Sequence, residues 1–277
     1  MGAGTFICRT CGVEYPGGSG PPGSCPICED ERQYVGPGGQ QWTTLAELAG
    51  AGHQSDLREV EPSLLGIGVT PRFAIGQRAL LVQTAAGNLL WDPPGFFDDR
   101  AADAVRQRGG LAAISASHPH FFGCMASWSR RFDGAPMLVP AADRRWLPWQ
   151  DRAVTAWSGS AEVLPGVTLV QCGGHFPGSA VVHWAAGAAG RGALLTGDTI
   201  GVAADRRWVS FMRSFPNNIP LPAVAIRRIL ERLAPWRYDR IYGGWWDSIV
   251  DRDAEAAVRR SADRYLRWIA GEEDPDR

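Results

Sequence analysis

The sequence predicts a mixed α+β fold in which a small metal-binding module precedes one larger domain. Two observations predict this. Four of the six cysteines form two CxxC pairs near the N-terminus, and short apolar runs typical of strands alternate with amphipathic segments typical of helices. A chain of 277 residues is also long enough to bury one sizeable core.

The first module, residues 1–36, contains a CxxC pair, a 13-residue spacer and a second CxxC pair. Each pair can form a tight turn whose two thiolates point at one ion, and four thiolates complete a tetrahedral shell. The spacer is rich in Gly and Pro, so a bound ion must organise it. We therefore predict a structural zinc site formed by Cys8, Cys11, Cys25 and Cys28. The CxxCG and CPxC pairs also resemble rubredoxin-like iron knuckles, with a shorter spacer, so iron is the alternative metal.

Residues 37–56 are predicted to be a connector with one short helical turn, and residues 57–277 the main domain. This domain is expected to open with a strand over 72–84, a turn at AAGN and a second strand ending at Asp92. Apolar runs on both sides of a Gly-Asn turn predict a hairpin. Residues 98–110 form a predicted helix, with acidic residues in its first turn and glycines at its end.

The rest of the main domain continues to alternate between strands and helices, with no internal repeat. A buried strand over 111–117 delivers the first histidine pair. Further strands are predicted at 167–172, 180–185, 192–197 and 239–244, and helices at 222–235 and 251–271.

The segment ISASHPHFFGCM holds two of the five histidines, His118 and His120. In an extended chain, residues two apart point to the same side, so both imidazoles can face one ion. A cupin site would need a glutamate a few residues later, but the next glutamate is Glu162. An amidohydrolase barrel would need more chain than the 157 residues that follow, and often a lysine, of which the chain has none. Both folds are disfavoured.

Later motifs make the histidine pair more specific. His175 lies in a glycine-flanked turn 55 residues after His120, and Asp198 ends a buried strand 23 residues later. With Asp92 at an earlier strand end, this order resembles the metallo-β-lactamase-fold hydrolases over about residues 65–270. The resemblance implies an αββα sandwich with a metal site at one edge of its two sheets.

The resemblance also implies residue roles. His118 and His120 match the first two histidines of the family's HxHxDH motif, and His175 matches the lone histidine of the next motif. Asp198 matches the aspartate that bridges two metals or ligates one. Asp92 matches the strand-end aspartate that orients the site.

Three ligands of the family's second metal are missing from the sequence. The motif's aspartate and last histidine would stand at Phe122 and Gly123, and a final histidine would follow strand 239–244, where Gly243 and Gly244 precede two tryptophans. The joint loss indicates a site for one metal ion, held by three histidines and Asp198. Zinc, iron and manganese all suit such a donor set.

The leading hypothesis is a metal-dependent hydrolase in which metal-bound hydroxide attacks an ester, thioester, lactone or amide of a small molecule. Bound zinc can lower the pKa of water to about 7. Asp198 or the hydroxide itself must then act as the base, with Tyr242 and Asp247 as further candidates near the missing histidine. Two alternatives stay open: a metal-stabilised binding or regulatory protein with weak or no turnover, and a redox protein with an iron tetrathiolate knuckle.

Composition limits the partners. A net charge of −1 and a pI of about 6.5 provide no basic field that would attract nucleic acid or anionic lipid. The first residues lack the apolar core of a secretory signal, and no apolar run approaches the roughly 20 residues that span a bilayer. We therefore expect a cytoplasmic protein with no membrane and no nucleic-acid partner. The knuckle can cover the active-site mouth, contact a second subunit or recruit a protein partner.

Several other residues have simpler expected roles. His183 is expected to be a strand histidine with its hydrogen bonds satisfied, and His53 to be exposed. Cys124 and Cys172 are expected to be buried small side chains. Arg213 is a candidate anchor for an anionic substrate. Four tryptophans are candidate walls of an apolar pocket: Trp128, Trp208, Trp245 and Trp246.

Overall fold

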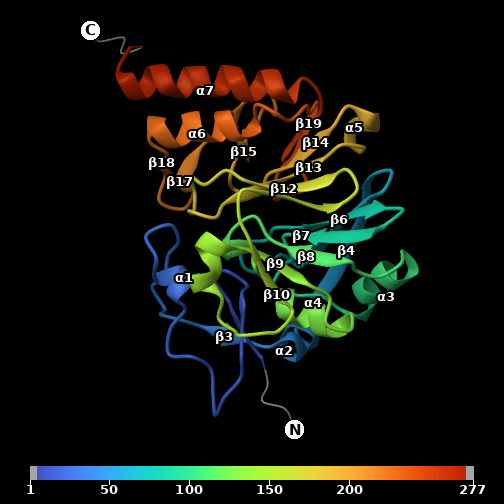
Figure 1. Cartoon of the computed structure of the whole chain (residues 1–277). Helices are drawn as coiled ribbons and strands as arrows, with labels where there is room; N and C mark the ends of the chain where they lie inside the picture. Colours follow the sequence, from blue (N-terminus) through green and yellow to red (C-terminus); the bar gives the residue numbers. More distant parts are fainter. Residues whose placement is uncertain (1–4, 273–277) are drawn as a thin grey trace.

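Two β-sheets packed face to face form the centre of the computed structural model, which describes residues 5–272 (Figure 1). In the first sheet seven strands lie in the order β10-β9-β8-β7-β6-β5-β4. Their bounds are β4 (Gln54–Glu61), β5 (Leu64–Thr70), β6 (Ala79–Thr84), β7 (Gly87–Trp91), β8 (Ala113–Ser115), β9 (Met137–Pro140) and β10 (Val154–Trp157). In the second sheet six strands lie in the order β11-β12-β13-β14-β19-β20. Their bounds are β11 (Ser160–Leu164), β12 (Val167–Gln171), β13 (Ala180–Trp184), β14 (Ala193–Leu195), β19 (Arg240–Tyr242) and β20 (Ile249–Val250).

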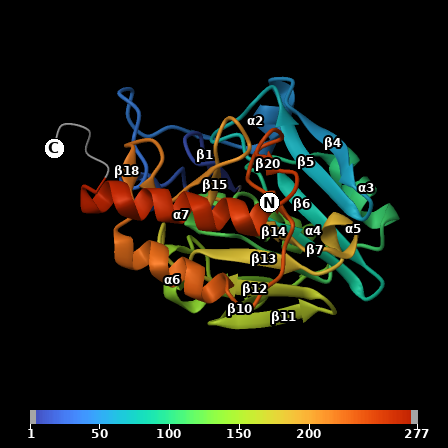
Figure 2. The ribbon, with the colours of Figure 1, turned by 90° about the horizontal axis from the view of Figure 1, so that it is seen from above.

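Helices cover the outer faces of both sheets. α3 (Asp99–Gln107) and α4 (Met125–Arg131) lie on the outer side of the first sheet, and α6 (Ala223–Leu233) and α7 (Ala254–Ala270) run side by side over the second (Figures 1 and 2). The two helices over the second sheet share one apolar cluster with its strands, which includes Val170, Val181, Leu194, Ile226, Ile229 and Val258. The layers are therefore αββα, which confirms the predicted fold class.

The core between the sheets comes from strand residues that alternate inward. In β6 and β7, every second residue belongs to this core, so that the opposite face of the same strands serves the outer helices. The inter-sheet cluster includes Leu80, Val82, Leu89 and Trp91 of the first sheet, and Val167, Leu169, Val182 and Leu195 of the second.

Several predicted elements are confirmed with their local causes. β6 and β7 form the antiparallel hairpin, with Thr84 opposite Gly87 at its turn. The side chain of Asp98 caps α3 by accepting a hydrogen bond from the backbone N–H of Ala101. Strands and helices also occur at each later segment for which they were predicted.

The prediction that the main domain opens with a strand over 72–84 is wrong, because β4 and β5 precede β6 and residues 72–78 are outside any strand. β4 is the edge strand and is mostly polar, so it lacks the apolar signal of a buried strand. β5 is interrupted by Gly66 and Gly68, which are weak strand formers. Their missing side chains make room for Trp246: a Cβ on Gly66 would lie 2.4 Å from its ring.

The four-cysteine module is a small three-stranded sheet with a short helix. β1 (Phe6–Cys8) pairs with both β2 (Glu14–Tyr15) and β3 (Trp42–Thr43), and α1 (Pro26–Glu29) carries the second CxxC pair. β3 lies within the stretch predicted as a connector, so this stretch completes the sheet of the knuckle. It also contains α2 (Leu45–Gly50), the expected helical turn.

The knuckle shares its core with the main domain. Its buried Ile7, Val13 and Ile27 belong to the same apolar cluster as Phe121 and Phe122, which follow the histidine pair. His53, expected to be exposed, is half-buried against Phe73 and Phe96 at this junction. The knuckle therefore packs against the segment that carries the predicted metal ligands.

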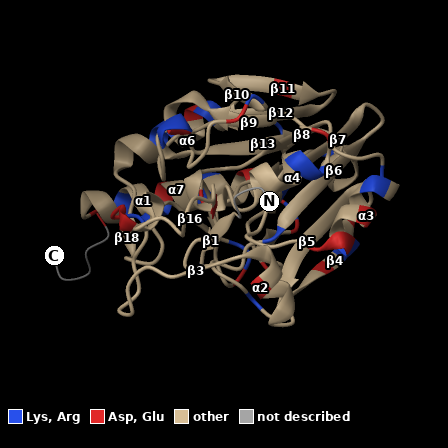
Figure 3. Ribbon diagram, turned by 90° about the horizontal axis from the view of Figure 1, so that it is seen from below, with Lys and Arg blue, Asp and Glu red and all other residues tan. Residues whose placement is uncertain are grey.

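The remaining elements are short. They are β15 (Gly201–Val202), β16 (Val209–Ser210), β17 (Met212–Ser214), β18 (Ile219–Pro220), α5 (Gly187–Gly190) and the 3-10 helices η1 (Pro119–Phe121) and η2 (Ala141–Trp146). Among the described residues, no helix has the length and apolarity needed to cross a membrane. Basic and acidic positions are interspersed along the ribbon (Figure 3), in keeping with the net charge of −1.

Candidate metal centres

The structure brings together the four side chains that the sequence predicts for the active-site metal. One donor atom each from His118, His120, His175 and Asp198 lie within 4.8 Å of one another, and all four residues are buried. His175 Nε2 lies 3.3 Å from His120 Nδ1. Asp198 Oδ2 lies 3.5 Å from His118 Nε2 and 3.9 Å from His175 Nε2.

These distances fit one tetrahedral ion. Zinc–nitrogen and zinc–oxygen bonds of about 2.0–2.1 Å place tetrahedral ligands about 3.3–3.4 Å apart. Nε2 of His118 and Oδ1 of Asp198 are buried and have no hydrogen-bond partner within residues 5–272. Unpaired buried polar atoms are costly, and a cation between these side chains would pair with the first and neutralise the charge of the second.

A chain of contacts orients His118. The hydroxyl of Ser117 lies 2.9 Å from His118 Nδ1, which leaves Nε2 directed at the cluster. The backbone N–H of Ser117 donates to Asp92 Oδ1 at 2.6 Å. Gly197, next to Asp198, packs so closely that a Cβ there would lie 2.1 Å from the Ser117 hydroxyl. Asp92 at its strand end, Ser117 and Gly197 therefore position His118 together.

The other two histidines are held differently. His175 follows β12 in a loop, and its Nδ1 donates to the carbonyl of Met212 at 3.1 Å, so that Nε2 keeps its lone pair for a metal. Gly174 lets this loop approach α6, since a Cβ there would lie 3.1 Å from Ile229 of this helix. His120 lies on η1 and faces the cluster with Nδ1, while its Nε2 has no partner in the described part of the chain.

Burial keeps these imidazoles neutral. Loss of hydration lowers the pKa of His175 to about 3 and the pKa of His120 well below its usual value. Neutral imidazole is the form that binds a metal ion. At pH 7 both rings are therefore in the ligating state without having to lose a proton.

Asp92 lies next to the cluster, in contact with Ser117, and is not one of its four donors. Burial raises the pKa of its carboxyl to about 8, and the hydrogen bonds from Ser117 oppose that rise. Its backbone φ is +56°, a left-handed conformation that aspartate tolerates better than most residues. This placement suits a positioning role, as the resemblance implies.

Residues without metal-binding groups stand at the motif positions that the resemblance assigns to a second metal. Phe121 packs against the ring of His118, and Phe122 is fully buried against Trp149. Gly123 has a φ of +48°, and a Cβ there would lie 2.0 Å from the carbonyl oxygen of Pro93, so no histidine fits in this backbone position.

The two glycines at the motif position of the missing last histidine contact a buried arginine. Arg78 is buried and donates from Nη1 to the carbonyl of Gly243 at 2.6 Å. Its backbone N–H donates to the carbonyl of Gly244. Among the described residues, the four donors above and the four cysteines are the two groups that gather at metal-binding distances.

A cavity of about 200 Å³ leads to three of the four donors, His120, His175 and Asp198. Besides the donors, its walls come from four places: the knuckle, the loop between β5 and β6, the segment around β17, and the loop between β19 and β20. The lining residues are Thr10, Gln33, Tyr34, Arg72, Ala74, Ile75, His120, His175, Asp198, Phe215, Pro216 and Trp245. The knuckle therefore forms part of the wall of this cavity, which favours the first of the three roles that its sequence left open.

Other predicted residues have separate positions. Arg213 pairs with Glu31 of the knuckle and is absent from this cavity, whose rim carries Arg72 instead. Asp247 is exposed and pairs with Arg206. Tyr242 is buried next to Arg240.

Of the four tryptophans, Trp245 lines the cavity, whereas Trp128 is buried between Phe97 and Phe132. Trp208 stacks with Arg264, and Trp246 covers the glycines of β5. His183 is a satisfied strand histidine, as expected, through a contact of 2.9 Å to the carbonyl of Arg237.

The cysteine cluster also fits a tetrahedral ion. Cys8 Sγ lies 3.6 Å from Cys28 Sγ, and Cys11 Sγ lies 3.8 Å from Cys25 Sγ. Bonds of about 2.3 Å to one zinc place tetrahedral sulfurs about 3.8 Å apart, whereas a disulfide needs about 2.05 Å. Tyr15 contacts Cys25 Sγ through its hydroxyl at 3.0 Å, a further contact that suits a thiolate. Cys124 and Cys172 are buried outside both clusters, as expected.

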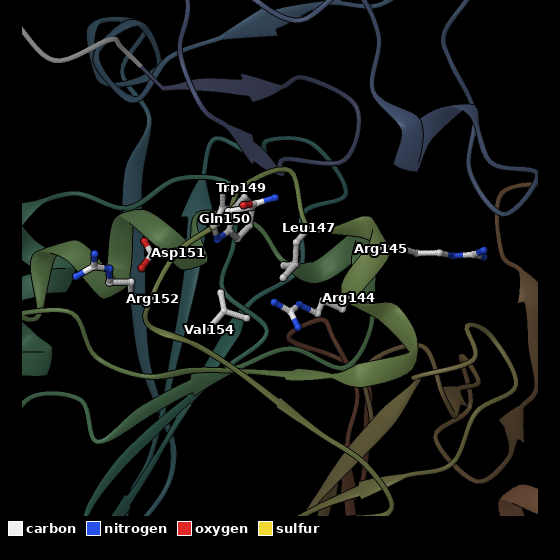
Figure 4. A pocket seen from close by; sticks show the side chains of 8 residues that line it. All are labelled: Arg144, Arg145, Leu147, Trp149, Gln150, Asp151, Arg152 and Val154. Carbon is white, nitrogen blue, oxygen red and sulfur yellow. The ribbon is translucent and has the colours of Figure 1, made fainter.

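A second, larger hollow of about 570 Å³ lies apart from the donors, around the segment that follows η2 (Figure 4). Its lining includes Arg144, Arg152 and the carboxylate of Asp151, while Arg145 extends away from the other labelled side chains. None of the eight lining residues is a candidate metal ligand.

Removing the Ser117 hydroxyl is expected to weaken metal binding at the histidine cluster. In the Ser117→Ala variant His118 loses the contact that orients its ring, and loss of such supporting contacts costs about 10–100-fold in metal affinity. Competition with a chromogenic chelator measures this affinity. The matched control is Ser129→Ala, which also removes a buried hydroxyl, one bonded to the carbonyl of Ala135 outside the cluster. Equal affinity in both variants would contradict the orienting role.

Comparison with known proteins finds a relative that is similar in sequence and a group of solved structures that are similar in fold. The chain is 43% identical over 269 residues to the uncharacterized protein YmaE of Bacillus subtilis (strain 168), with 96% of this chain and 97% of the relative covered. No protein-family model matches. Among solved structures, the DIM-1 metallo-β-lactamase has a TM-score of 0.56 at 14% identity, covering 76% of this chain and 96% of its own. The metal-soaked Flv1 flavodiiron core of Synechocystis sp. PCC6803 has a TM-score of 0.54 at 12% identity, covering 77% of this chain and 61% of its own.

Proposed function

The chain belongs to the family of Bacillus subtilis YmaE within the metallo-β-lactamase-fold superfamily, and on this premise we propose that it is a metal-dependent hydrolase with one active-site metal ion. The substrate class is an ester, thioester, lactone or amide of a small molecule. The proposed ligands are His118, His120, His175 and Asp198.

One observation carries this proposal. Three histidines and one carboxylate are gathered at the distances of a single tetrahedral ion, at the base of a cavity that reaches the surface. A site that served stability alone would have no need of such an opening. The missing ligands of a second metal favour carbonyl substrates over phosphodiesters, whose cleavage is typical of two-metal sites.

A bound divalent ion would supply Lewis acidity, polarising a carbonyl oxygen and lowering the pKa of a water molecule towards 7. The protein's own contribution is to fix the donors and to provide a place for a proton. Asp198 Oδ2 faces the histidines, whereas Oδ1 is buried with no partner among the described residues, so Oδ1 is free to accept a proton. Asp92 acts through Ser117 as a positioning residue.

The cavity limits the size of the reacting group. About 200 Å³ is below the roughly 300–1,000 Å³ of sites that enclose drug-sized ligands. Tyr34, Phe215 and Trp245 provide apolar walls, and Arg72 places one cation at the rim. These features favour a small, largely apolar acyl group or lactone over a bulky polar one.

The test compares metal content and hydrolysis in two double variants. The wild-type chain is expected to hold two metal ions, one at each cluster. The His118→Ala, His120→Ala variant should keep the cysteine-bound ion and lose the other, with hydrolysis of ester and lactone substrates reduced at least about a thousandfold. The matched control, His53→Ala, His183→Ala, removes two histidines outside the cluster and should keep both ions.

Each departure from this result has a defined meaning. If the wild-type chain keeps both ions but hydrolyses none of the substrates, the metal-stabilised binding protein is favoured instead. If the histidine site fails to bind zinc, iron or manganese, the hydrolase proposal fails. A red protein would identify iron at the four cysteines and favour the redox alternative, because zinc tetrathiolate is colourless.

A further inference from the structure

Four arginines line a third hollow, next to the loop that carries His175. Its volume is about 430 Å³, and its lining includes Arg32, Arg213, Arg228 and Arg232. No aspartate or glutamate is among its lining residues. The floor includes Gly173 and Gly174, the two residues that precede His175.

Two of these arginines have no counter-charge. Arg228 and Arg232 lie one turn apart on α6, and neither has a hydrogen-bond or ion-pair partner in the described part of the chain. The intervening Glu231 lines a different hollow, together with Leu230 and Leu233. Both guanidiniums therefore remain available to a ligand.

The other two arginines form the opposite wall. Arg213 pairs with Glu31, and Arg32 pairs with Asp30 at 2.6 Å and stacks over Phe176. The Arg32 side chain is 7% exposed, and its Nε is buried without a partner among residues 5–272. A buried guanidinium with a free N–H is expected to seek an acceptor.

The charges match a dianion. Four guanidiniums and two paired carboxylates leave a net charge of +2, and a phosphate monoester carries about −1.5 to −2 at pH 7. Guanidinium groups recognise phosphate through paired N–H donors. The hollow is also larger than a phosphate group, so it has room for an attached organic group.

We propose that this hollow, which we call the arginine pocket, binds the phosphate group of a small phosphorylated molecule. The site is separate from the four metal donors and does not depend on the proposed hydrolase activity. A ligand in the arginine pocket would touch the backbone next to His175. It would also bridge the knuckle and α6, which both contribute arginines to the pocket.

Calorimetric titration at low ionic strength tests the proposal with two probes, inorganic phosphate and glycerol 2-phosphate. Both should bind the full-length wild-type protein, the ester at least as tightly as the free ion. The Arg228→Gln, Arg232→Gln variant should lose at least about tenfold in affinity for each. Both side chains are exposed, so the melting temperature of this variant should match that of the wild type.

The matched control is Arg144→Gln, Arg152→Gln, which removes the same charge from the hollow of Figure 4. That hollow contains the carboxylate of Asp151, and this control should bind both probes as the wild type does. Equal losses in both variants would show a general effect of net charge and overturn the site. So would a failure of the wild type to bind, or weaker binding of the ester than of phosphate.

One further arm separates the arginine pocket from the metal centre, because phosphate also binds metal ions. The His118→Ala, His120→Ala variant should bind both probes with unchanged affinity. If it loses binding while the Arg228→Gln, Arg232→Gln variant retains it, the phosphate binds at the metal centre and the proposal is wrong. Hydrolysis can fail in the test above without affecting this result.

Discussion

Replacing Cys25 and Cys28 with alanine is expected to disrupt the active-site cavity as well as the cysteine metal site. A structural zinc ion contributes an apparent free energy of about 10–16 kcal/mol to a small metal-organised module. Without two of its ligands the knuckle loses this stabilisation. Gln33 and Tyr34, which line the cavity, follow Cys28 closely in the chain, so their positions depend on the fold of the knuckle.

Direct contacts carry the effect from the knuckle to the histidine pair. The buried carboxylate of Glu14 accepts hydrogen bonds from the backbone and the hydroxyl of Ser127, at the start of α4. The backbone N–H of Glu14 donates to the carbonyl of Gly123, three residues after His120. Loss of the knuckle would therefore expose Phe121 and Phe122 and loosen the segment that holds His118 and His120.

Contacts on the other side reach the loop of His175. Arg32 stacks over Phe176, and its carbonyl accepts a hydrogen bond from the hydroxyl of Ser214. Asn217 donates to the carbonyls of Glu31 and Gln33. Both sides of the metal centre are thus tied to the knuckle.

The measurement is the melting temperature, together with metal content at both sites. The Cys25→Ala, Cys28→Ala variant should melt at least about 10 °C lower, since 1 kcal/mol corresponds to about 2–4 °C in chains of 150–250 residues. Its affinity for metal at the histidine site should also fall. The control is Cys124→Ala, Cys172→Ala, two buried cysteines outside both clusters, which should keep both ions. A variant that loses the cysteine-bound ion but keeps its melting temperature and its histidine-bound ion would refute the coupling.

The second large effect is expected from Gly123→Ala. Its φ of +48° is unfavourable for any residue with a Cβ, and the added carbon would lie 2.0 Å from the carbonyl oxygen of Pro93. The atoms that this carbon would meet belong to the backbone, so the overlap cannot be relieved by rotating a side chain. We expect a loss of about 4 kcal/mol or more in the free energy of unfolding, the range of severe steric defects.

Gly134→Ala is the matched control, because Gly134 also has a positive φ, of +79°, but a Cβ there meets no atom within 4 Å. It should cost about 1 kcal/mol, from backbone strain alone. Urea unfolding of both variants isolates the contribution of the Pro93 contact. Similar losses in the two would show that the backbone shifts easily at Gly123. In that case a histidine at position 123, as in the family's motif, would also be tolerated. We expect that it is not.

Local spacing explains what could be predicted of the fold and the site. The hairpin of β6 and β7 follows from apolar runs around a Gly-Asn turn, and α3 from its Asp98 cap. β4 was missed because an edge strand needs few apolar residues. β5 was missed because its glycines, which make room for the ring of Trp246, weaken its strand pattern. Ser117 could have been noticed, since it directly precedes His118, but a serine beside a histidine is too common to indicate an orienting contact.

The sequence by itself determined the four cysteines and the pair His118 and His120, because CxxC and His-x-His bring ligands together through short-range backbone geometry, whereas His175 and Asp198 were indicated by the order of motifs in the family resemblance. It also determined the absence of the second-site ligands, which is a matter of residue identity. Only the tertiary structure decided that the knuckle forms a wall of the cavity, that Arg213 pairs with Glu31, and that four arginines surround one hollow. These contacts join residues up to about 200 positions apart, and their distances depend on how two sheets and a knuckle pack. Packing of this kind leaves no periodic signal in the chain, so it appears only when the surfaces meet.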